Sequence, residues 1–437
     1  MRLYKNTPNR RYFCVLMGTE NHQLITLSNG LRVVHQRVRG TQLVHAGFSI
    51  NTGSKNDDQY PGLAHCLEHM LFKGTEHRKT IHVLNHLEVV GGELNAYTTK
   101  EITTIYGTTQ GKHLSRLTDI LCDVIFRSTF PSQELEKEKK VIVDEINMYL
   151  DTPEENIFDE FQERIFEGHP LAHNILGTEA SVNTIQQQQL FDFVKTHYRY
   201  ENMVFSVVGN VSIERVLAAL DRFLPKELDT VGPSAKGNRL TLETIPAFTP
   251  QKTFVETKKT DFNQAYAILG SLAYEIDHPK RWTLLLLNNF FGGPVLNSRL
   301  NLAIREKYGY TYNVESGYST FTETGLFHCF VGSEPKYIEK SVSLIFKELK
   351  KIRTQSLGSL QLSRAKNQYA GQLVLSNENR SGLMMHLGQS ILRKGNATKI
   401  EQAIESIQRV TASDIMDVAN EILREEQFSQ LLYVPED

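Results

Sequence analysis

The order of expected strands and helices in the first half of this chain recurs in its second half. The first half predicts a strand at residues 43–50, helices at 62–72 and 80–90, a hairpin at 93–108, helices at 112–128 and 132–149, and a late strand at 203–208. The second half predicts a strand at 265–271, helices at 280–291 and 297–307, a strand pair at 310–318 and 325–332, helices at 335–352 and from 360, and a late strand at 430–434. Residue identity between the halves is faint, so the repeat depends on element order. It predicts an α+β fold of two homologous domains, each a mostly antiparallel or mixed sheet covered by helices.

The segment at residues 226–252 is rich in glycine and proline and has little periodicity, which is typical of a linker. A chain of 437 residues is also too long for one ordinary core. We therefore predict domains at residues 20–225 and 253–437. Residues 1–19 contain no acidic residue, and their apolar run is too short for a secretory signal, so we expect a loose arm or a translation-start artefact.

Composition excludes several classes of partner. The formal net charge of −2 favours neither nucleic acid nor an anionic membrane surface, and no apolar run approaches the roughly 18 residues that span a bilayer. The four cysteines are scattered, without a Cys-x-x-Cys pair, which favours a reducing compartment. We expect a cytoplasmic protein, with the mitochondrial matrix or the periplasm as alternatives.

The stretch at residues 62–75, GLAHCLEHMLFKGT, carries the clearest chemistry. Residues four apart on a helix share a face, so His65 and His69 can both reach one ion at the Zn–N distance of about 2.0–2.1 Å. Glu68 can lie beside that metal without binding it, which is where a general base for an activated water belongs. Because the string is short, a chance polar face on a helix is the alternative.

A catalytic zinc ion usually has three protein ligands and one open position, so the third ligand must come from elsewhere. The expected helix at 132–149 offers the acidic residues Glu134, Glu136, Glu138, Asp144 and Glu145. Glu145 lies near Ile142 and Ile146, which makes it the better candidate for a buried ligand. Glu138 is seven residues earlier on the same face and would then hold a histidine or the water in place.

Two other histidine pairs share the four-residue spacing. Between His82 and His86, an asparagine occupies the position of the glutamate, so these are interpreted as surface or packing residues. Between His169 and His173, Pro170 argues against a helix. Neither pair predicts a metal site.

The wider sequence resembles a known peptidase family. The run at 62–75 resembles the HxxEH signature of inverted zinc peptidases. With LSNGLRVV at 27–34, GGELNAYT at 91–98 and EKKVIVDE at 138–145, it resembles the pitrilysin/insulinase family in its short two-domain form. That form is similar to bacterial processing peptidases and to the β subunit of mitochondrial processing peptidase. The resemblance covers the chain from about residue 26 and implies a catalytic first domain and a degenerate second one, which has no HxxEH.

The resemblance also implies residue roles. It assigns one Zn²⁺ per chain to His65, His69 and Glu145, with Glu68 as the base and Glu138 in an accessory role. The implied protein is a zinc metalloendopeptidase that hydrolyses short or unfolded peptides. The alternative is a non-catalytic partner or scaffold subunit of a processing-peptidase-like complex, although such subunits usually have broken zinc motifs. A zinc-binding protein without peptidase activity is a third alternative.

The same resemblance implies a substrate site. Asn95 and Ala96 match the strand that lines the family's cleft and helps to hold the substrate. Arg305 and Tyr312 match residues that contact the substrate backbone and the developing charge, since Arg offers fixed donors and Tyr a hydroxyl. A salt-bridged surface arginine and a strand tyrosine are the alternative. Four such domains form the family's closed chamber, so a two-domain chain implies a homodimer in which Arg305 and Tyr312 act at the partner's zinc site.

Overall fold

The computed structural model describes residues 15–18, 22–226 and 252–436, and these form two compact units. Unit 1 comprises described residues of 1–146, 173–239 and 376–397. Unit 2 comprises those of 147–172, 240–375 and 398–437. Each unit therefore contains a segment from the other half of the chain.

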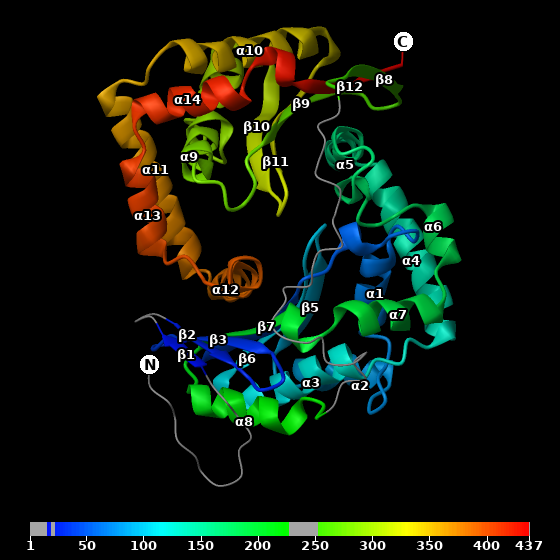
Figure 1. The fold of residues 1–437 in the computed structure, drawn as a ribbon. Helices are drawn as coiled ribbons and strands as arrows, with labels where there is room; N and C mark the ends of the chain where they lie inside the picture. Colours follow the sequence, from blue (N-terminus) through cyan, green and yellow to red (C-terminus); the bar gives the residue numbers. More distant parts are fainter. Residues whose placement is uncertain (1–14, 19–21, 227–251, 437) are drawn as a thin grey trace. The chain divides into compact units, whose positions relative to one another are not determined.

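Unit 1 is built on a mixed sheet (Figure 1). Its strands are β1 (Val15–Gly18), β2 (Gln23–Thr26), β3 (Arg32–Arg37), β4 (Leu43–Ile50), β5 (Glu93–Thr98), β6 (Thr103–Gln110) and β7 (Met203–Gly209). Within the described residues the order is β1-β2-β3-β7-β4-β6-β5, and all neighbours are antiparallel except β3 and β7. Strand β5 is thus the last of this sheet in the part of the chain described.

The helices of unit 1 lie around this sheet. They are α1 (Leu63–Met70), α2 (Thr80–Glu88), α3 (Leu114–Phe126), most of α4 (Ser132–Leu150), α6 (Glu179–Thr184), α7 (Gln187–His197), α8 (Ile213–Phe223) and α12 (Arg380–Lys394). Helix α3 packs against β6, β4 and α8. Apolar side chains such as Leu117 and Leu121 are fully buried there, which joins the helical layer to the sheet.

Helix α12 comes from the C-terminal half of the chain but packs on β7 and β4 of unit 1. Asn379 caps its first turn by accepting the Gly382 N–H, and Gly395 ends it with a φ of 74°. Its apolar face packs into a core with Val204 and Val208. A Cβ at Gly388 would lie 2.5 Å from Ser206 Oγ and 2.7 Å from Ser49 Oγ, so this close approach requires glycine.

Unit 2 repeats the central part of that topology. Its strands are β8 (Val255–Thr260), β9 (Ala265–Ala273), β10 (Thr311–Thr320), β11 (Gly325–Ser333) and β12 (Ser429–Pro435). Their order is β10-β11-β9-β12-β8, with β12 and β8 parallel and the other neighbours antiparallel. Read from the opposite end, this is the order and direction of β3-β7-β4-β6-β5 in unit 1. The predicted repeat of two mixed α+β sheets is confirmed.

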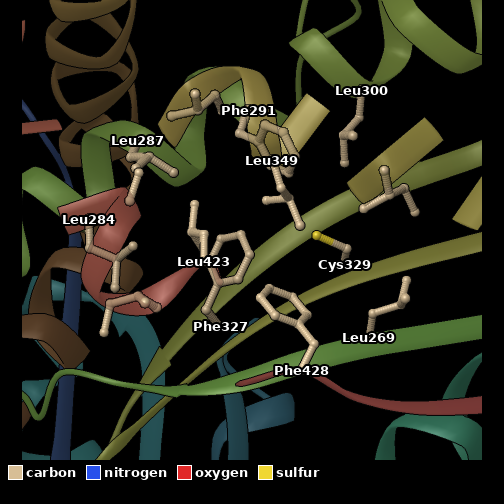
Figure 2. Packing of buried hydrophobic residues seen from close by; sticks show 14 of the residues in the cluster. Leu269, Leu284, Leu287, Phe291, Leu300, Phe327, Cys329, Leu349, Leu423 and Phe428 are labelled. Carbon is tan, nitrogen blue, oxygen red and sulfur yellow. The ribbon is translucent and has the colours of Figure 1, made fainter. Parts of the chain in front are cut away.

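Two clusters of apolar side chains hold unit 2 together. The helices are α5 (Pro153–Ile165), α9 (Arg281–Gly292), α10 (Ile338–Thr354), most of α11 (Ser359–Glu378), α13 (Ile400–Arg409) and α14 (Ala412–Ile422). Figure 2 shows one cluster, in which Leu284 and Phe291 of α9, Phe327 of β11 and Leu349 of α10 pack together. On the other cluster α5 places Phe161 against the sheet, and a Cβ at Gly270 would lie 2.7 Å from this ring.

Most predicted elements are present, within a few residues at their ends. The predicted helix at 297–307 contains the π-helical turn η5 (Asn301–Glu306). Residues 15–18, expected in a loose arm, form strand β1, and residues 227–251 of the predicted linker lie outside the described residues. The sequence did not predict that α5 belongs to unit 2 and α12 to unit 1. None of the described helices is both long and apolar enough to cross a membrane.

Candidate metal centre

Helix α1 begins at a tightly fixed turn. Gly62 has a φ of 92°, and a Cβ there would lie 2.5 Å from the carbonyl oxygen of Leu176. The carboxylate of Asp57 accepts the backbone N–H groups of Gly62 at 2.8 Å and Ala64 at 2.9 Å. An acidic group at this position satisfies orphan N–H groups of the first turn and favours the positive end of the helix. This turn fixes where α1 starts and so where its histidines point.

His65, His69 and Glu145 converge on one point. One ligand atom from each residue lies within 4.8 Å of the other two. Oε2 of Glu145 is 3.8 Å from Nε2 of His65 and 3.5 Å from Nε2 of His69. Tetrahedral ligands at Zn–N and Zn–O distances near 2.0–2.1 Å are separated by roughly 3.4 Å. The residues therefore fit a zinc ion held by three protein ligands.

The electrostatics of the two rings also fit a cation. Burial and the neighbouring His69 ring lower the pKa of His65 to about 4, so that ring is neutral and its lone pair is available. Burial opposes charge on His69 too, but hydrogen bonds with Glu145 and Glu138 outweigh it and raise the pKa of His69. The hydrogen bond with His69 lowers the pKa of Glu145, which keeps this carboxylate ionised. The three groups together attract positive charge, as a divalent ion requires.

Glu68 lies outside this ligand set and is held by strand β5. Thr98 Oγ1 donates a hydrogen bond of 2.6 Å to Oε2 of Glu68. Burial raises the pKa of Glu68, and the Thr98 hydrogen bond opposes that rise. A carboxylate with one oxygen held and a raised proton affinity is suited to accept a proton from a water beside the metal site.

Glu138 joins the centre to the loop that follows α1. Its Oε2 is 3.1 Å from Nδ1 of His69, and its Oε1 is 2.6 Å from Nζ of Lys73. The contact at Nδ1 leaves Nε2 of His69 facing Glu145, so Glu138 fixes the orientation of this ring. By contrast, the buried Nδ1 of His65 has no hydrogen-bond partner among the described residues.

The structure thus brings together five residues singled out from the sequence: His65, Glu68, His69, Glu138 and Glu145. Sequence reasoning gave no role to Asp57, Lys73 or Thr98. Thr98 and Lys73 stand in the runs at 91–98 and 62–75, but nothing in the spacing shows which side chains they contact. Of the histidines set aside, His86 and Asp119 are 3.6 Å apart, and His82 is exposed on α2.

Comparisons with known proteins show the family to which this chain belongs. Residues 32–179 match the model of the insulinase family (peptidase family M16), and residues 184–369 match the M16 inactive domain. A zinc protease of Bacillus subtilis, named YmxG and described as uncharacterized, is 30% identical over 403 residues, which cover 92% of this chain and 95% of that protein. The chain belongs to peptidase family M16. The resemblance predicted from the sequence is confirmed.

Another relative and two solved structures are similar to this chain over nearly its whole length. The uncharacterized zinc protease SCO5738 of Streptomyces coelicolor is 30% identical, with 91% of this chain and 86% of that protein covered. A protease from Helicobacter pylori has the same fold at a TM-score of 0.86 and 19% identity, covering 95% of this chain and 99% of that one. An M16 inactive-domain protein from Pseudomonas fluorescens also has a TM-score of 0.86, at 20% identity, with 95% and 98% covered.

The M16 inactive domain has a helix where α1 stands in the first unit. Helix α9 follows β9 as α1 follows β4, and its sequence RWTLLLLNNFFG has no HxxEH. Buried leucines such as Leu286 and Leu287 occupy its inner face. Helix α9 therefore contributes to the apolar core rather than to a metal site, as expected for a second domain that lacks the zinc motif.

The four predicted substrate residues lie on β5, on η5 and on β10, and β5 and β10 are the end strands of their sheets in the described chain. Asn95 and Ala96 are on β5 in unit 1, with Asn95 exposed. Arg305 is on η5 and Tyr312 on β10 in unit 2, and the guanidinium carbon lies 5.3 Å from the centroid of the tyrosine ring. Tyr312 is 87% exposed, so its hydroxyl is presented to the surroundings of unit 2. Nε of Arg305 is also 3.7 Å from Oε1 of Glu306, an ion pair of the kind expected under the alternative of a salt-bridged surface arginine.

Proposed function

We propose that this M16 protein is a zinc-dependent endopeptidase that hydrolyses short or unfolded peptides. The observation that carries the proposal is the convergence of His65, His69 and Glu145 on one point while Glu68 stands beside them outside the ligand set. Three protein ligands leave one coordination position open, as in catalytic rather than structural zinc sites. The names of the relatives, zinc proteases, support the same metal.

His65, His69 and Glu145 would hold one Zn²⁺ per chain. When bound, zinc acts as a Lewis acid that polarises a carbonyl oxygen and makes water more acidic. The carboxylate of Glu68 accepts a proton from the water that attacks the scissile carbonyl carbon. Glu68 then returns this proton to the nitrogen of the leaving amine as the C–N bond breaks. Thr98 keeps the carboxylate aimed during both transfers, and Glu138 keeps the His69 ring in place.

An extended peptide fits the edge of the sheet in unit 1. Strand β5 pairs with β6 through residues Glu93 to Thr98, and it ends the sheet within the described chain. A substrate strand added there would run beside Ala96 and past Thr98, next to the catalytic glutamate. Peptides that are already unfolded can adopt this conformation without a prior unfolding step.

The decisive test compares the wild type with Glu68→Gln. Both proteins are assayed with a pool of quenched fluorescent peptides, and their zinc content is measured by elemental analysis. We expect one zinc per chain in both, cleavage by the wild type, and no turnover by the variant. Treatment with a chelator should abolish cleavage, and added Zn²⁺ should restore it. Loss of zinc from Glu68→Gln would refute the role of Glu68 as a base, and zinc without cleavage in the wild type would favour the scaffold alternative.

We further propose a homodimer in which Arg305 and Tyr312 of one chain serve the zinc site of the other. On unit 2 the exposed Tyr312 lies beside the half-buried Arg305, and the two side chains offer donors suited to a peptide carbonyl and an oxyanion. A complementation experiment tests this arrangement. Glu68→Gln and Tyr312→Phe chains, each inactive alone, are mixed and allowed to exchange. Recovered activity is expected only if base and tyrosine come from different chains; no recovery would mean that each chain is self-contained or that Tyr312 is not required.

We also propose that the protein works in a reducing compartment such as the cytoplasm, because its described cysteines are free thiols. Cys66, Cys122 and Cys329 are unpaired and buried, and burial raises the pKa of all three thiols. Cys66 lies within the zinc helix but does not belong to the convergent ligand group. Its thiol therefore serves packing in the proposed enzyme rather than metal binding.

A further inference from the structure

An open cavity of about 490 Å³ lies in unit 1 at the junction of α2, α3 and α8. It is lined by His86 from α2, by Lys112, His113, Ser115, Arg116 and Asp119 at and after the start of α3, and by Arg222 and Phe223 at the end of α8. None of these residues belongs to the candidate metal centre. The cavity takes no part in the chemistry proposed above.

The charges that line this cavity do not cancel. Asp119 is the only carboxylate in the lining, and it is already paired with Arg78 at 2.6 Å. No acidic partner within 4.0 Å of Lys112, Arg116 or Arg222 is found in the described part of the chain. Three permanent positive charges therefore face the same space without a counter-charge of their own.

One of these cations is held in place by a hydrogen bond, and a second lies against an aromatic ring. Arg116 donates its Nε–H to the backbone oxygen of His86, which fixes the guanidinium beside α2 and leaves its terminal N–H groups available. Arg222 lies over the ring of Phe223, with 5.1 Å between the guanidinium carbon and the ring centroid. Ordering of the Arg116 guanidinium reduces the entropy lost when a ligand binds.

The helix at the rim adds to the positive potential. Helix α3 starts at Leu114, has no acidic residue in its first turn, and receives no hydrogen bond from the side chain of its N-cap residue His113. The turn at Gly111–His113 runs into α3, and the Leu114 N–H is already donated to the Gly111 carbonyl, so the contribution of the helix is the positive end of its dipole between Lys112 and Arg116. Burial and the nearby charges of Arg78 and Arg116 lower the pKa of His86, as a positive environment should.

We propose that this cavity binds a small anion made of two or more linked phosphoryl groups. The volume suits a small molecule rather than a folded partner, and three unpaired cations call for at least two negative charges in a short span. The planar guanidinium groups of Arg116 and Arg222 match phosphate oxygens, which they can bind with two parallel N–H donors. The source of the phosphoryl groups is either inorganic or a nucleotide, whose base could lie against the ring of Phe223.

The test is calorimetric titration of the full chain with pyrophosphate, followed by ADP and ATP. We expect saturable binding of pyrophosphate at one site per chain. Equal affinity for pyrophosphate and ADP would point to an inorganic ligand, and tighter binding of ADP would point to a nucleotide; either result supports the site. The absence of saturable binding for all three compounds would overturn the proposal.

Variants locate the bound anion. Lys112 and Arg222 are exposed, so Lys112→Gln/Arg222→Gln should fold normally, which its unfolding temperature checks. It should bind pyrophosphate roughly tenfold more weakly or worse, since two charge-assisted contacts are lost. The matched control, Lys195→Gln/Lys350→Gln, removes two exposed charges from α7 and α10 and should bind like the wild type. Unchanged binding in the Lys112→Gln/Arg222→Gln protein, as would occur if pyrophosphate bound the metal centre, would overturn the proposal.

Discussion

Thr98 on strand β5 donates a 2.6 Å hydrogen bond to the carboxylate of Glu68 on helix α1. The bond joins the edge of the sheet, where a peptide is proposed to bind, to the group proposed to move the proton. It restrains Oε2 of Glu68, so that Oε1 is the oxygen left for the proposed proton transfer. In the proposed reaction, Thr98 would therefore link the strand that positions the peptide to the residue that moves the proton.

Replacing Thr98 with valine should therefore impair chemistry without removing the metal. Valine keeps the shape and strand preference of threonine but cannot donate, and a hydrogen bond to a charged group is worth about 1.5–3 kcal/mol. We expect kcat/KM to fall by roughly 10–100-fold while zinc content stays at the wild-type level. The Thr98→Ser protein retains the hydroxyl and should keep most of the activity. A fully active valine variant would show that the bond does not position Glu68.

Glu138 should determine how tightly the metal is held. It contacts Nδ1 of His69 through one oxygen and Lys73 through the other, so its removal frees the ring and leaves a half-buried lysine without its partner. Comparable partners of metal-binding histidines contribute about 10–100-fold to affinity. Glu138→Ala should lose zinc to a competing chelator at correspondingly lower concentration.

The control for this measurement is a glutamate on the same helix. The side chain of Glu136 is 68% exposed and pairs with Lys139 rather than with a histidine. Glu136→Ala should therefore retain wild-type zinc affinity. Equal affinities in the two alanine variants would mean that Glu138 does not orient His69.

The sequence predicted the parts of the centre that local geometry determines. The spacing of His65 and His69 follows from the period of one helix, and Glu145 could be preferred because it lies among apolar residues on another. Thr98 and Lys73 could not be assigned in this way, because their contacts depend on how β5 and the loop after α1 pack in three dimensions. The capping of α1 by Asp57 has the same origin, since it closes a turn that periodicity does not describe.

The same distinction holds for the fold. Element order predicted both mixed sheets, because strands and helices can be recognised in a sequence by hydrophobic periods of two and 3.6 residues. The period of α12 says that one face is apolar but not which sheet it covers. Its packing on β4 and β7 of unit 1 depends on the tertiary structure. The sequence features that correspond to it are Gly388 on the helix and Ser49 and Ser206 on the strands, which approach closely.

That close approach predicts opposite effects for two glycine-to-alanine changes. In Gly388→Ala the new methyl group would meet Ser206 and Ser49 at under 3.0 Å, so α12 or the two hydroxyls must shift. We expect the free energy of unfolding to fall by about 1 kcal/mol or more. Gly371 is inside α11 with no atom within 4 Å of an added Cβ, so Gly371→Ala should raise it by about 0.5–1 kcal/mol. Denaturant titrations would measure both, and a Gly388→Ala protein as stable as the wild type or more stable would contradict the packing described for α12.

Acid should weaken unit 2 through His328. This side chain on β11 packs against the edge of Phe158, its Nδ1 is buried with no hydrogen-bond partner in the described chain, and burial lowers its pKa to about 4. An unfolded histidine titrates near 6.5, so between pH 6.5 and 4 the unfolded chain binds the extra proton and stability falls as pH falls. The loss should approach ~3 kcal/mol at pH 4 and then level off for this group.

His328→Phe cannot titrate and should lack this part of the pH dependence of the free energy of unfolding. His82→Gln, at an exposed position on α2, should follow the wild type. An unchanged pH profile in His328→Phe would show that this histidine is not the acid-sensitive group.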